Sequence, residues 1–371
     1  MQARLKWIVA PTVLVSAVAL LAGQASQFEL VPKIVFSSNR RTPTCTTPAV
    51  SALELYLMDL DGTHVQRLTD NEGCTHSDFN AALSPDGKKI VLDSTRDAAS
   101  IPPGSLFVMA SDGTEPTFLT RGSSPTWSLN STLVAFHASS GLDPTPIRNQ
   151  PGSPTRDSDI FVANVDDVVA GTAVPKNISN SPDMIDEDAD WSPDGTKIAF
   201  TSDPVSDWLG VPFPGNPFNY PTKEIFVMNP DGTGLTQLTF NTYEERGPAW
   251  SPDGSRIAFI GRVGVRGGNT FEICIINADG TNLVQLTDNG VFDGTMTWSP
   301  DGHKVIFQRP GGANPTLLYA VDADTTCDTT KPVTSSCTCS AGVGNACVTQ
   351  LTTDGVSLFP HLGQLRVHIR K

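Results

Sequence analysis

The sequence has a deficit of positive charge. Its 371 residues include 25 Lys and Arg against 39 Asp and Glu, which gives a net charge of −14. This balance opposes binding to nucleic-acid phosphates and to anionic lipid, and favours basic partners, cations or simply solubility. Hydrophobic residues make up 39% and charged residues 17%, which suits a packed globular protein and argues against disorder.

Common catalytic motifs are also missing. The sequence contains no G-x-S-x-G elbow, no H-E-x-x-H, no P-loop and no dinucleotide fingerprint. Any catalysis would therefore have to be built from loops.

Long hydrophobic runs are absent except at the N-terminus. Arg4 and Lys6 precede an apolar stretch at residues 7–22, and small residues lead to Ala25. This pattern predicts a secretory signal peptide over residues 1–25, so we expect an exported protein, periplasmic or extracellular. The stretch is short for a membrane span, and an uncleaved anchor is the alternative. Cleavage would remove two positive charges, change the net charge from −14 to −16 and leave no membrane span.

Seven cysteines in an exported chain should mostly form disulfides. Cys274 lies in an apolar segment and is expected to be a buried free thiol. Cys45 and Cys74 are expected to pair with each other. Three pairings remain open for the four cysteines of one loop, which are Cys327, Cys337, Cys339 and Cys347. Their spacing lacks C-x-x-C, so zinc is not favoured.

One repeated motif dominates the chain. Trp-Ser-Pro-Asp-Gly begins at residues 191, 250 and 298, with weaker copies at residues 83 and 127. Proline and aspartate suit the central positions of a tight turn, and glycine accepts the left-handed conformation that follows. An apolar strand leaves each turn, so the motif predicts a β-hairpin.

Two further signals recur in fixed order. An apolar strand such as Ile-Phe-Val-Met begins at residues 55, 106, 160, 225, 273 and 317. A short segment such as Gln-Leu-Thr begins at residues 67, 118, 177, 237, 285 and 350. With no helical period between copies, the sequence predicts an all-β, six-bladed propeller of four-stranded blades over residues 26–371.

The two chain ends are predicted to close the ring. Residues 33–36 read as a second strand with no first strand before it, and residues 357–362 are expected to supply that strand. Residues 365–369 then form a surplus strand without a place. We expect a monomer.

These three motifs together resemble the TolB-type, WD40-like propeller repeat, over essentially the whole chain after the signal peptide. The resemblance implies the propeller fold. TolB proteins carry an α/β domain before the propeller, whereas here only residues 26–33 separate the predicted cleavage site from Ile34. We therefore expect a propeller without that domain.

Blade topology places the longer insertions at one end of the ring, which we call the top. Five residues before the Trp position lie Asp78, Asp186, Glu245 and Asp293. We expect these carboxylates at the channel mouth, as a site for Ca²⁺ or another divalent cation, or for a basic peptide. The alternative is that arginines at the ends of second strands neutralise them, and the candidates are Arg40, Arg96, Arg262 and Arg309.

The insertion at residues 203–223 is rich in aromatic residues. Trp208, Phe213 and Tyr220 stand among prolines and glycines. These side chains are expected either to present aromatic faces to a sugar or peptide, or to fold back as a plug.

Three histidines allow a second hypothesis. His76, His137 and His361 fall in consecutive blades near the predicted top, where they could hold a metal together with Asp78. That arrangement would suit a metal-assisted carbohydrate lyase or hydrolase, with three unrelated histidines as the alternative. The favoured hypothesis is a non-catalytic binding or scaffold protein for a protein or cell-envelope ligand.

Overall fold

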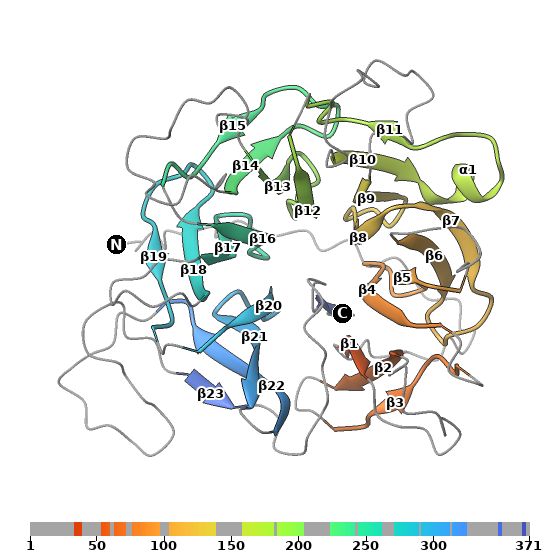
Figure 1. Cartoon of the computed structure of the whole chain (residues 1–371), viewed down its shortest axis with the longest axis horizontal. Coiled ribbons are helices and arrows are strands. Elements are labelled where there is room, and N and C mark those ends of the chain that lie inside the picture. The colour runs from red at the N-terminus through yellow and green to blue at the C-terminus, as the bar shows by residue number, and fades with distance from the viewer. Residues whose placement is uncertain are drawn as a thin grey trace, which may run out of the picture.

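Each sequence repeat folds as one antiparallel four-stranded sheet. The computed structural model describes residues 33–38, 53–59, 63–71, 76–96, 104–138, 158–181, 184–203, 223–241, 244–261, 271–288, 291–311, 314–324, 348–350 and 366–368. Six such sheets surround a centre like the blades of a propeller (Figure 1). The predicted six-bladed, all-β propeller is confirmed.

Blades 1 to 3 contain the strands up to residue 177, together with β24 from near the C-terminus. In each blade the strands are given from the inside of the ring outwards. Blade 1 consists of β24 (Arg366–His368), β1 (Lys33–Ser38), β2 (Glu54–Asp59) and β3 (Gln66–Arg67). Blade 2 consists of β4 (Asp78–Leu83), β5 (Lys89–Ser94), β6 (Ser105–Ala110) and β7 (Thr117–Arg121). Blade 3 consists of β8 (Ser123–Trp127), β9 (Leu133–Ala138), β10 (Asp159–Asn164) and β11 (Lys176–Asn177).

The other three blades follow the same order. Blade 4 consists of β12 (Asp186–Trp191), β13 (Ile198–Ser202), β14 (Glu224–Met228) and β15 (Thr236–Gln237). Blade 5 consists of β16 (Glu245–Trp250), β17 (Arg256–Gly261), β18 (Glu272–Asn277) and β19 (Val284–Gln285). Blade 6 consists of β20 (Gly294–Trp298), β21 (Lys304–Gly311), β22 (Asn314–Asp322) and β23 (Val348–Gln350).

The innermost strand of blade 1 differs from the one that the sequence predicts. β24 pairs with β1 in antiparallel register, with Lys33 opposite His368 and Val35 opposite Arg366. It also contacts β4 and β20, the innermost strands on either side. The stretch at residues 365–369 is therefore not surplus, and it occupies the place assigned to residues 357–362, which lie outside the described residues.

The hairpin turns form as the sequence predicts. In the copy at residues 191–195, the Ser192 hydroxyl donates to Asp194 Oδ1 at 2.6 Å, and the Gly195 N–H donates to the Ser192 carbonyl at 2.9 Å. Gly195 has φ +71°, the left-handed conformation that glycine adopts without strain. In the weakest copy Ser131 takes this place with φ +60°.

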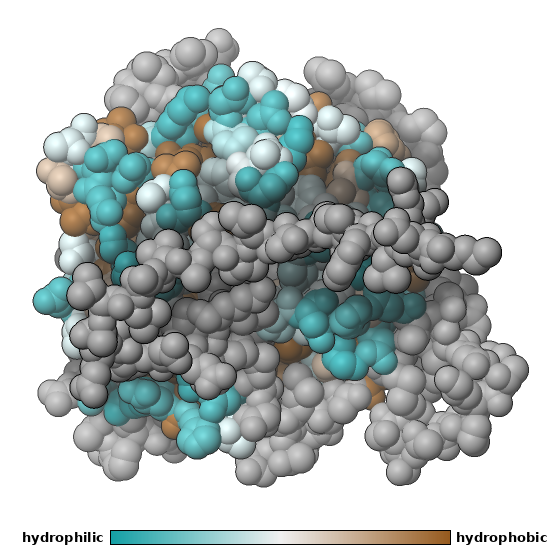
Figure 2. All heavy atoms as spheres, turned by 180° about the vertical axis from the view of Figure 1, so that it is seen from behind, coloured by the Kyte–Doolittle hydropathy of each residue, from teal (hydrophilic) through white to brown (hydrophobic). Residues whose placement is uncertain are grey.

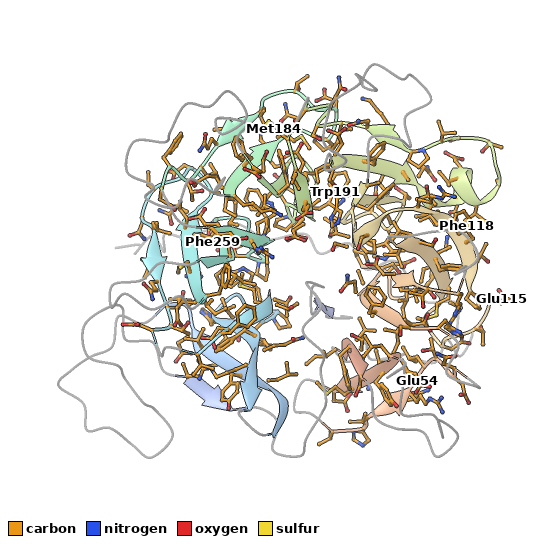
Figure 3. The ribbon with its side chains drawn as sticks, in the orientation of Figure 1. Glu54, Glu115, Phe118, Met184, Trp191 and Phe259 are labelled. Atoms are coloured by element: carbon orange, nitrogen blue, oxygen red, sulfur yellow. The ribbon has the colours of Figure 1, made fainter. Side chains whose placement is uncertain are left out.

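The core lies between blades. One cluster joins Trp127 and Phe136 of blade 3 with Leu106 of blade 2, and a second joins Phe200 of blade 4 with Ile160 of blade 3. Trp191 lies near the inner edge of blade 4, whereas Phe118 lies near the outer edge of blade 2 (Figure 3). One blade alone would leave its faces in water, so the ring supplies the hydrophobic stabilisation.

One feature of the connections was not predicted. A short helix, α1 (Val165–Val169), lies between β10 and β11, and the Asn164 side chain accepts from the backbone N–H groups of Asp166 and Asp167. It is the one helix within the described ranges, and it is far too short to cross a membrane.

Cys274 is buried as a free thiol in β18, as expected.

Candidate functional site

The predicted carboxylates occupy equivalent places at the top of the ring. Asp78, Asp186 and Glu245 begin the innermost strands β4, β12 and β16, and Asp293 directly precedes β20. All four are 0% exposed. They are therefore interior groups of the top, rather than a ring of charges open to solvent.

A second set of buried acids was missed by the sequence reasoning. Each begins a third strand of a blade, and the set comprises Glu54, Asp159, Glu224 and Glu272. The signal was present, since each stands directly before the Leu or Ile that opens the repeated apolar strand.

The two sets meet at the interfaces between blades. The backbone N–H of each first-strand acid donates to the carbonyl of the residue just before a third-strand acid in the previous blade. The four bonds run from Asp78 to Leu53, Asp186 to Ser158, Glu245 to Lys223 and Asp293 to Phe271, all at 2.8–2.9 Å. We call the resulting pairs, Glu54–Asp78, Asp159–Asp186, Glu224–Glu245 and Glu272–Asp293, the interface acids.

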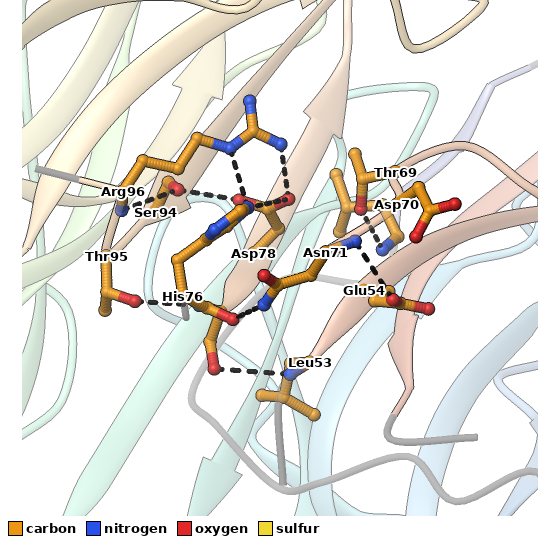
Figure 4. A network of polar contacts seen from close by, with 12 residues as sticks. Leu53, Glu54, Thr69, Asp70, Asn71, His76, Asp78, Ser94, Thr95 and Arg96 are labelled. Atoms are coloured by element: carbon orange, nitrogen blue, oxygen red, sulfur yellow. Dashed lines mark hydrogen bonds and ion pairs between the residues drawn. The ribbon is translucent and has the colours of Figure 1, made fainter. Parts of the chain in front are cut away.

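Arginine neutralises the pair between blades 1 and 2. Arg96 donates to Asp78 Oδ2 at 2.6 Å (Figure 4), and Arg67 forms an ion pair with Glu54. His76 also belongs to this network, because its Nε2 accepts from Arg96 Nε at 3.1 Å. Burial is the largest influence on the pKa of His76 and lowers it, although the Asp78 charge acts in the opposite direction.

Arginine also neutralises the pair between blades 5 and 6. Arg309 donates to both oxygens of Asp293, at 2.6 and 2.9 Å. The Thr287 hydroxyl donates to Glu272 Oε2 at 2.7 Å. The Arg309 guanidinium also stacks over the Tyr319 ring at 4.7 Å. Arg96 and Arg309 thus play the neutralising role that the sequence allowed, while Arg40 and Arg262 lie outside the described residues.

The other two pairs are held by neutral groups within the described ranges. Ser202 donates to Asp186 Oδ1 at 2.5 Å, and Asn177 donates to Asp159 Oδ2 at 2.8 Å. Asn241 donates to Glu245 Oε1 through its side chain at 2.6 Å. Its backbone N–H donates to Glu224 Oε1 at 3.1 Å. Asp186 Oδ2 and Glu224 Oε2 are buried without a hydrogen-bond partner.

Burial without a nearby cation favours the protonated form of these acids. Burial raises the pKa of Asp186 to about 6 and that of Glu245 to about 7. Burial, followed by the charge of Glu245, raises the pKa of Glu224 to about 8.

The innermost strands carry a bulge just inside the top. The pairing with the second strand shifts at equivalent places in the blades that begin with β4, β8, β12, β16 and β20. Asn80, Ser124, Asp188 and Gly247 have positive φ there. Bulges turn side chains away from the regular alternation, so polar groups converge where neighbouring innermost strands meet.

His137 lies at one of these bulges. The Asp188 N–H of blade 4 donates to His137 Nδ1 of blade 3 at 3.3 Å. Burial raises the pKa of Asp188 and lowers the pKa of His137, so both tend towards neutrality. Lys223 forms an ion pair with the adjacent Glu187, and Arg246 forms one with Glu244.

Aromatic residues are exposed at the top of blades 4–6. Phe240, which follows β15, is 77% exposed, and Phe292, which precedes β20, is 39% exposed. Phe292 meets Phe271 edge to face at 5.6 Å between ring centroids, and the Arg246 guanidinium lies over the Phe271 ring at 5.6 Å. We call Phe240, Arg246, Phe271 and Phe292 the top patch.

The face turned away in Figure 1 shows its apolar residues in several separate patches among hydrophilic residues (Figure 2). Single apolar residues of this kind are ordinary on protein surfaces.

Several predicted site residues cannot be placed. Trp208, Phe213, Tyr220 and His361 lie outside the described residues, as do the six cysteines expected to form disulfides. No group of three or more His, Cys, Asp or Glu side chains in the described part of the chain could hold a metal ion. His76 lies 4.0 Å from Asp78 and bonds to Arg96, whereas His137 bonds to blade 4. We therefore assign no metal ligand among them.

Comparison with known proteins agrees with this architecture. The profile of the TolB beta propeller domain matches residues 153–336. The chain is similar in structure to TolB from Acinetobacter baumannii, with a TM-score of 0.57 and 18% identity, over 91% of this chain and 65% of that one. It is also similar to a putative TolB from Agrobacterium tumefaciens, with a TM-score of 0.53 and 17% identity, over 87% and 89% of the two chains.

One sequence relative is an enzyme. A segment of 69 residues is 38% identical to dipeptidyl-peptidase 5 of Porphyromonas gingivalis. The match covers 19% of this chain and 10% of that peptidase. Because so little of the peptidase is matched, its activity is not carried over to this chain.

Proposed function

The chain carries a TolB-like β-propeller, and we propose that it acts as an exported binding module whose top face contacts a protein or cell-envelope ligand. The top patch is the observation that carries this proposal. Aromatic and arginine side chains are enriched at protein interfaces, where they bury large areas at little entropic cost. Phe240 and Phe292 are exposed here instead of joining the core.

The surroundings of the top patch suit recognition. Its residues sit on strand ends that the interface acids and their hydroxyl and amide partners hold between blades. A rigid scaffold lowers the entropic cost of binding. Glu187, Glu244 and Lys223 supply charge next to the aromatic groups, and the net charge of −14 favours a ligand with basic groups.

Export, a monomeric state and ring closure are part of the proposal. The N-terminal pattern supports cleavage after Ala25 and a periplasmic or extracellular location. The register between β24 and β1 supports closure of the ring by the two chain ends. The metal-assisted lyase or hydrolase is not favoured, because His76 and His137 have separate partners.

Matched surface variants test the binding face. The double variant Phe240→Ser, Phe292→Ser removes apolar groups from the top. The double variant Leu235→Ser, Leu283→Ser removes exposed leucines, 56% and 46% exposed, from the connections between third and fourth strands at the opposite end. Tagged forms would be recovered from the native envelope, and the ligand that co-purifies would be quantified.

We expect the top variant to lose most of the co-purifying ligand and the bottom variant to retain it. Raising salt should weaken the interaction, because charge complementarity contributes to it. Equal recovery with both variants, at unchanged thermal stability, would contradict a top binding face.

A further inference from the structure

Blade 4 differs from its neighbours in how it is held at the top. The Asp159–Asp186 pair joins it to blade 3, and the Glu224–Glu245 pair joins it to blade 5. Within the described ranges neither pair contacts an arginine or lysine. The equivalent pairs at the interfaces of blades 1–2 and 5–6 each contain an arginine ion pair.

The repeat provides an internal comparison. The same backbone hydrogen bond is present at all four interfaces, so the local backbone arrangement is equivalent at the four pairs. The groups that neutralise the acids differ from pair to pair. Two carboxylates that are both buried cannot both be ionised cheaply without a counter-charge. Where arginine is lacking, a proton is the simplest way to remove one charge.

Hydrogen bonds from neutral donors only partly oppose the effect of burial. Ser202 donates to Asp186, and Thr239 and Asn241 donate to Glu245; these bonds lower the pKa of each acid, but burial raises it by more. Glu224 is 2% exposed and Asp186 is 0% exposed, and each retains one buried oxygen without a partner. Such an oxygen is tolerated more easily on a neutral carboxyl than on a carboxylate.

We propose that protonation of the interface acids on both sides of blade 4 helps to hold this blade in the ring, and that the blade loosens as the pH rises from mildly acidic to mildly alkaline. The inference concerns the ring itself and stands whether or not the top face binds a partner. It makes blade 4 a pH-sensitive element of the propeller.

The neighbouring charges do not remove this dependence. Lys223 and Arg246 are adjacent in sequence to Glu224 and Glu245, but each forms an ion pair with another acid, Glu187 and Glu244 respectively. On β18, burial and then the charges of Glu245 and Glu272 raise the pKa of the Cys274 thiol, so the thiol supplies no charge to this region. On the blade 3 side, His137 faces Asp188 and Glu187.

The direction of the effect follows from proton linkage. The pKa values of about 6, 7 and 8 for Asp186, Glu245 and Glu224 lie above the ordinary values of 3.8 and 4.5. The folded state therefore binds more protons than the unfolded state at intermediate pH. The contribution is complete below the unfolded values, at about pH 4, falls as the pH rises, and is lost once the pH passes the folded-state values of about 6 to 8.

Hydrogen exchange at about pH 5 to 8.5, corrected for the intrinsic rate, would test the proposal on the full chain. We expect protection of β12–β15 to fall by about tenfold per pH unit for each proton by which the closed and open states differ, and to level off above about pH 8. The double variant Glu224→Gln, Glu245→Gln mimics the protonated pair and should reduce this slope, as should Asp186→Asn at the other interface. Glu272→Gln at an arginine-containing interface is the matched control and should leave the slope unchanged.

Three results would overturn the proposal. The first is protection that does not change with pH in the wild-type chain. The second is a slope shared equally by all blades. The third is an unchanged slope in both Glu224→Gln, Glu245→Gln and Asp186→Asn.

Discussion

At the residue scale, the tryptophans of the repeat are not equivalent. Trp127 Nε1 donates to the Ala82 carbonyl of the preceding blade at 2.9 Å, and Trp298 makes the same bond to Ala249. The Nε1 groups of Trp191 and Trp250 are buried without a hydrogen-bond partner. The same residue in the same motif therefore contributes differently from blade to blade.

This difference predicts unequal effects of one substitution. Trp127→Phe should destabilise the fold by about 1 kcal/mol more than Trp191→Phe, because only the first removes a hydrogen bond and leaves a buried carbonyl without its donor. Both remove similar aromatic area, so each serves as the control for the other. Denaturant unfolding measures the difference, and equal losses would contradict the bonding described.

The residue scale also shows where sequence reasoning succeeds and fails. The Ser-Pro-Asp-Gly turn could be predicted because its hydrogen bonds join residues within five positions. Arg96 was a candidate partner of Asp78 because both lie at strand ends of one hairpin, whereas Asn241 gave no signal for its bond to Glu224, 17 residues earlier in the chain. The first-strand acids were found by their spacing, but their burial and the third-strand acids were not.

At the element scale, the Leu-Thr signal of the fourth strand has a clear physical role. The hydroxyl of Thr69 accepts from the Leu55 N–H at 2.9 Å, and Thr239 and Thr287 do the same for Ile225 and Ile273. Each fourth strand is short, and the hydroxyl satisfies a buried N–H at the start of the third strand.

Replacement of this threonine should weaken one blade. Thr69→Val keeps the shape of the side chain but leaves the Leu55 N–H unsatisfied, at a cost of about 1–3 kcal/mol. Thr236→Val, on the exposed part of β15, should change stability by less than about 0.5 kcal/mol. Thermal unfolding would compare them, and a similar effect of both would argue against the role given to Thr69.

Strand existence was predicted well, whereas the place of one strand was not. Every described blade follows the order of apolar and turn signals in the sequence. β24 was misplaced because residues 357–362 carry a closer copy of the inner-strand pattern than residues 366–368 do. Pairing with β1 depends on the position of the chain end in the ring, which local pattern does not encode. α1 was not predicted because it lies in a connection of a single blade, so the repeat pattern gives no signal for it.

At the scale of the whole molecule, the proposed closure of the ring by the two chain ends predicts a specific effect of truncation. Deletion of residues 366–371 removes β24 and exposes the inner edge of β1, so stability should fall and exchange of Lys33–Ser38 should rise. Deletion of residues 369–371 leaves β24 intact and is the control. Equal stability of the two truncated chains would contradict closure through β24.

The whole molecule combines a rigid ring with a chemically distinct top. Buried acids with arginine, hydroxyl or amide partners join the blades there, and the top patch exposes aromatic groups beside charged ones. Different blade interfaces use different neutralising groups, and we propose that this end of the ring provides both a contact surface and a region that responds to pH.

Site-specific photo-crosslinking in the native host tests the binding face most directly. A photoreactive residue at Phe240 or Phe292 samples the top, and one at Leu235 or Leu283 samples the opposite end. The account predicts a discrete adduct from the top positions that is lost when Arg246→Glu is added, and none from the bottom positions. Adducts only from Leu235 or Leu283, or no adduct from any position, would contradict it.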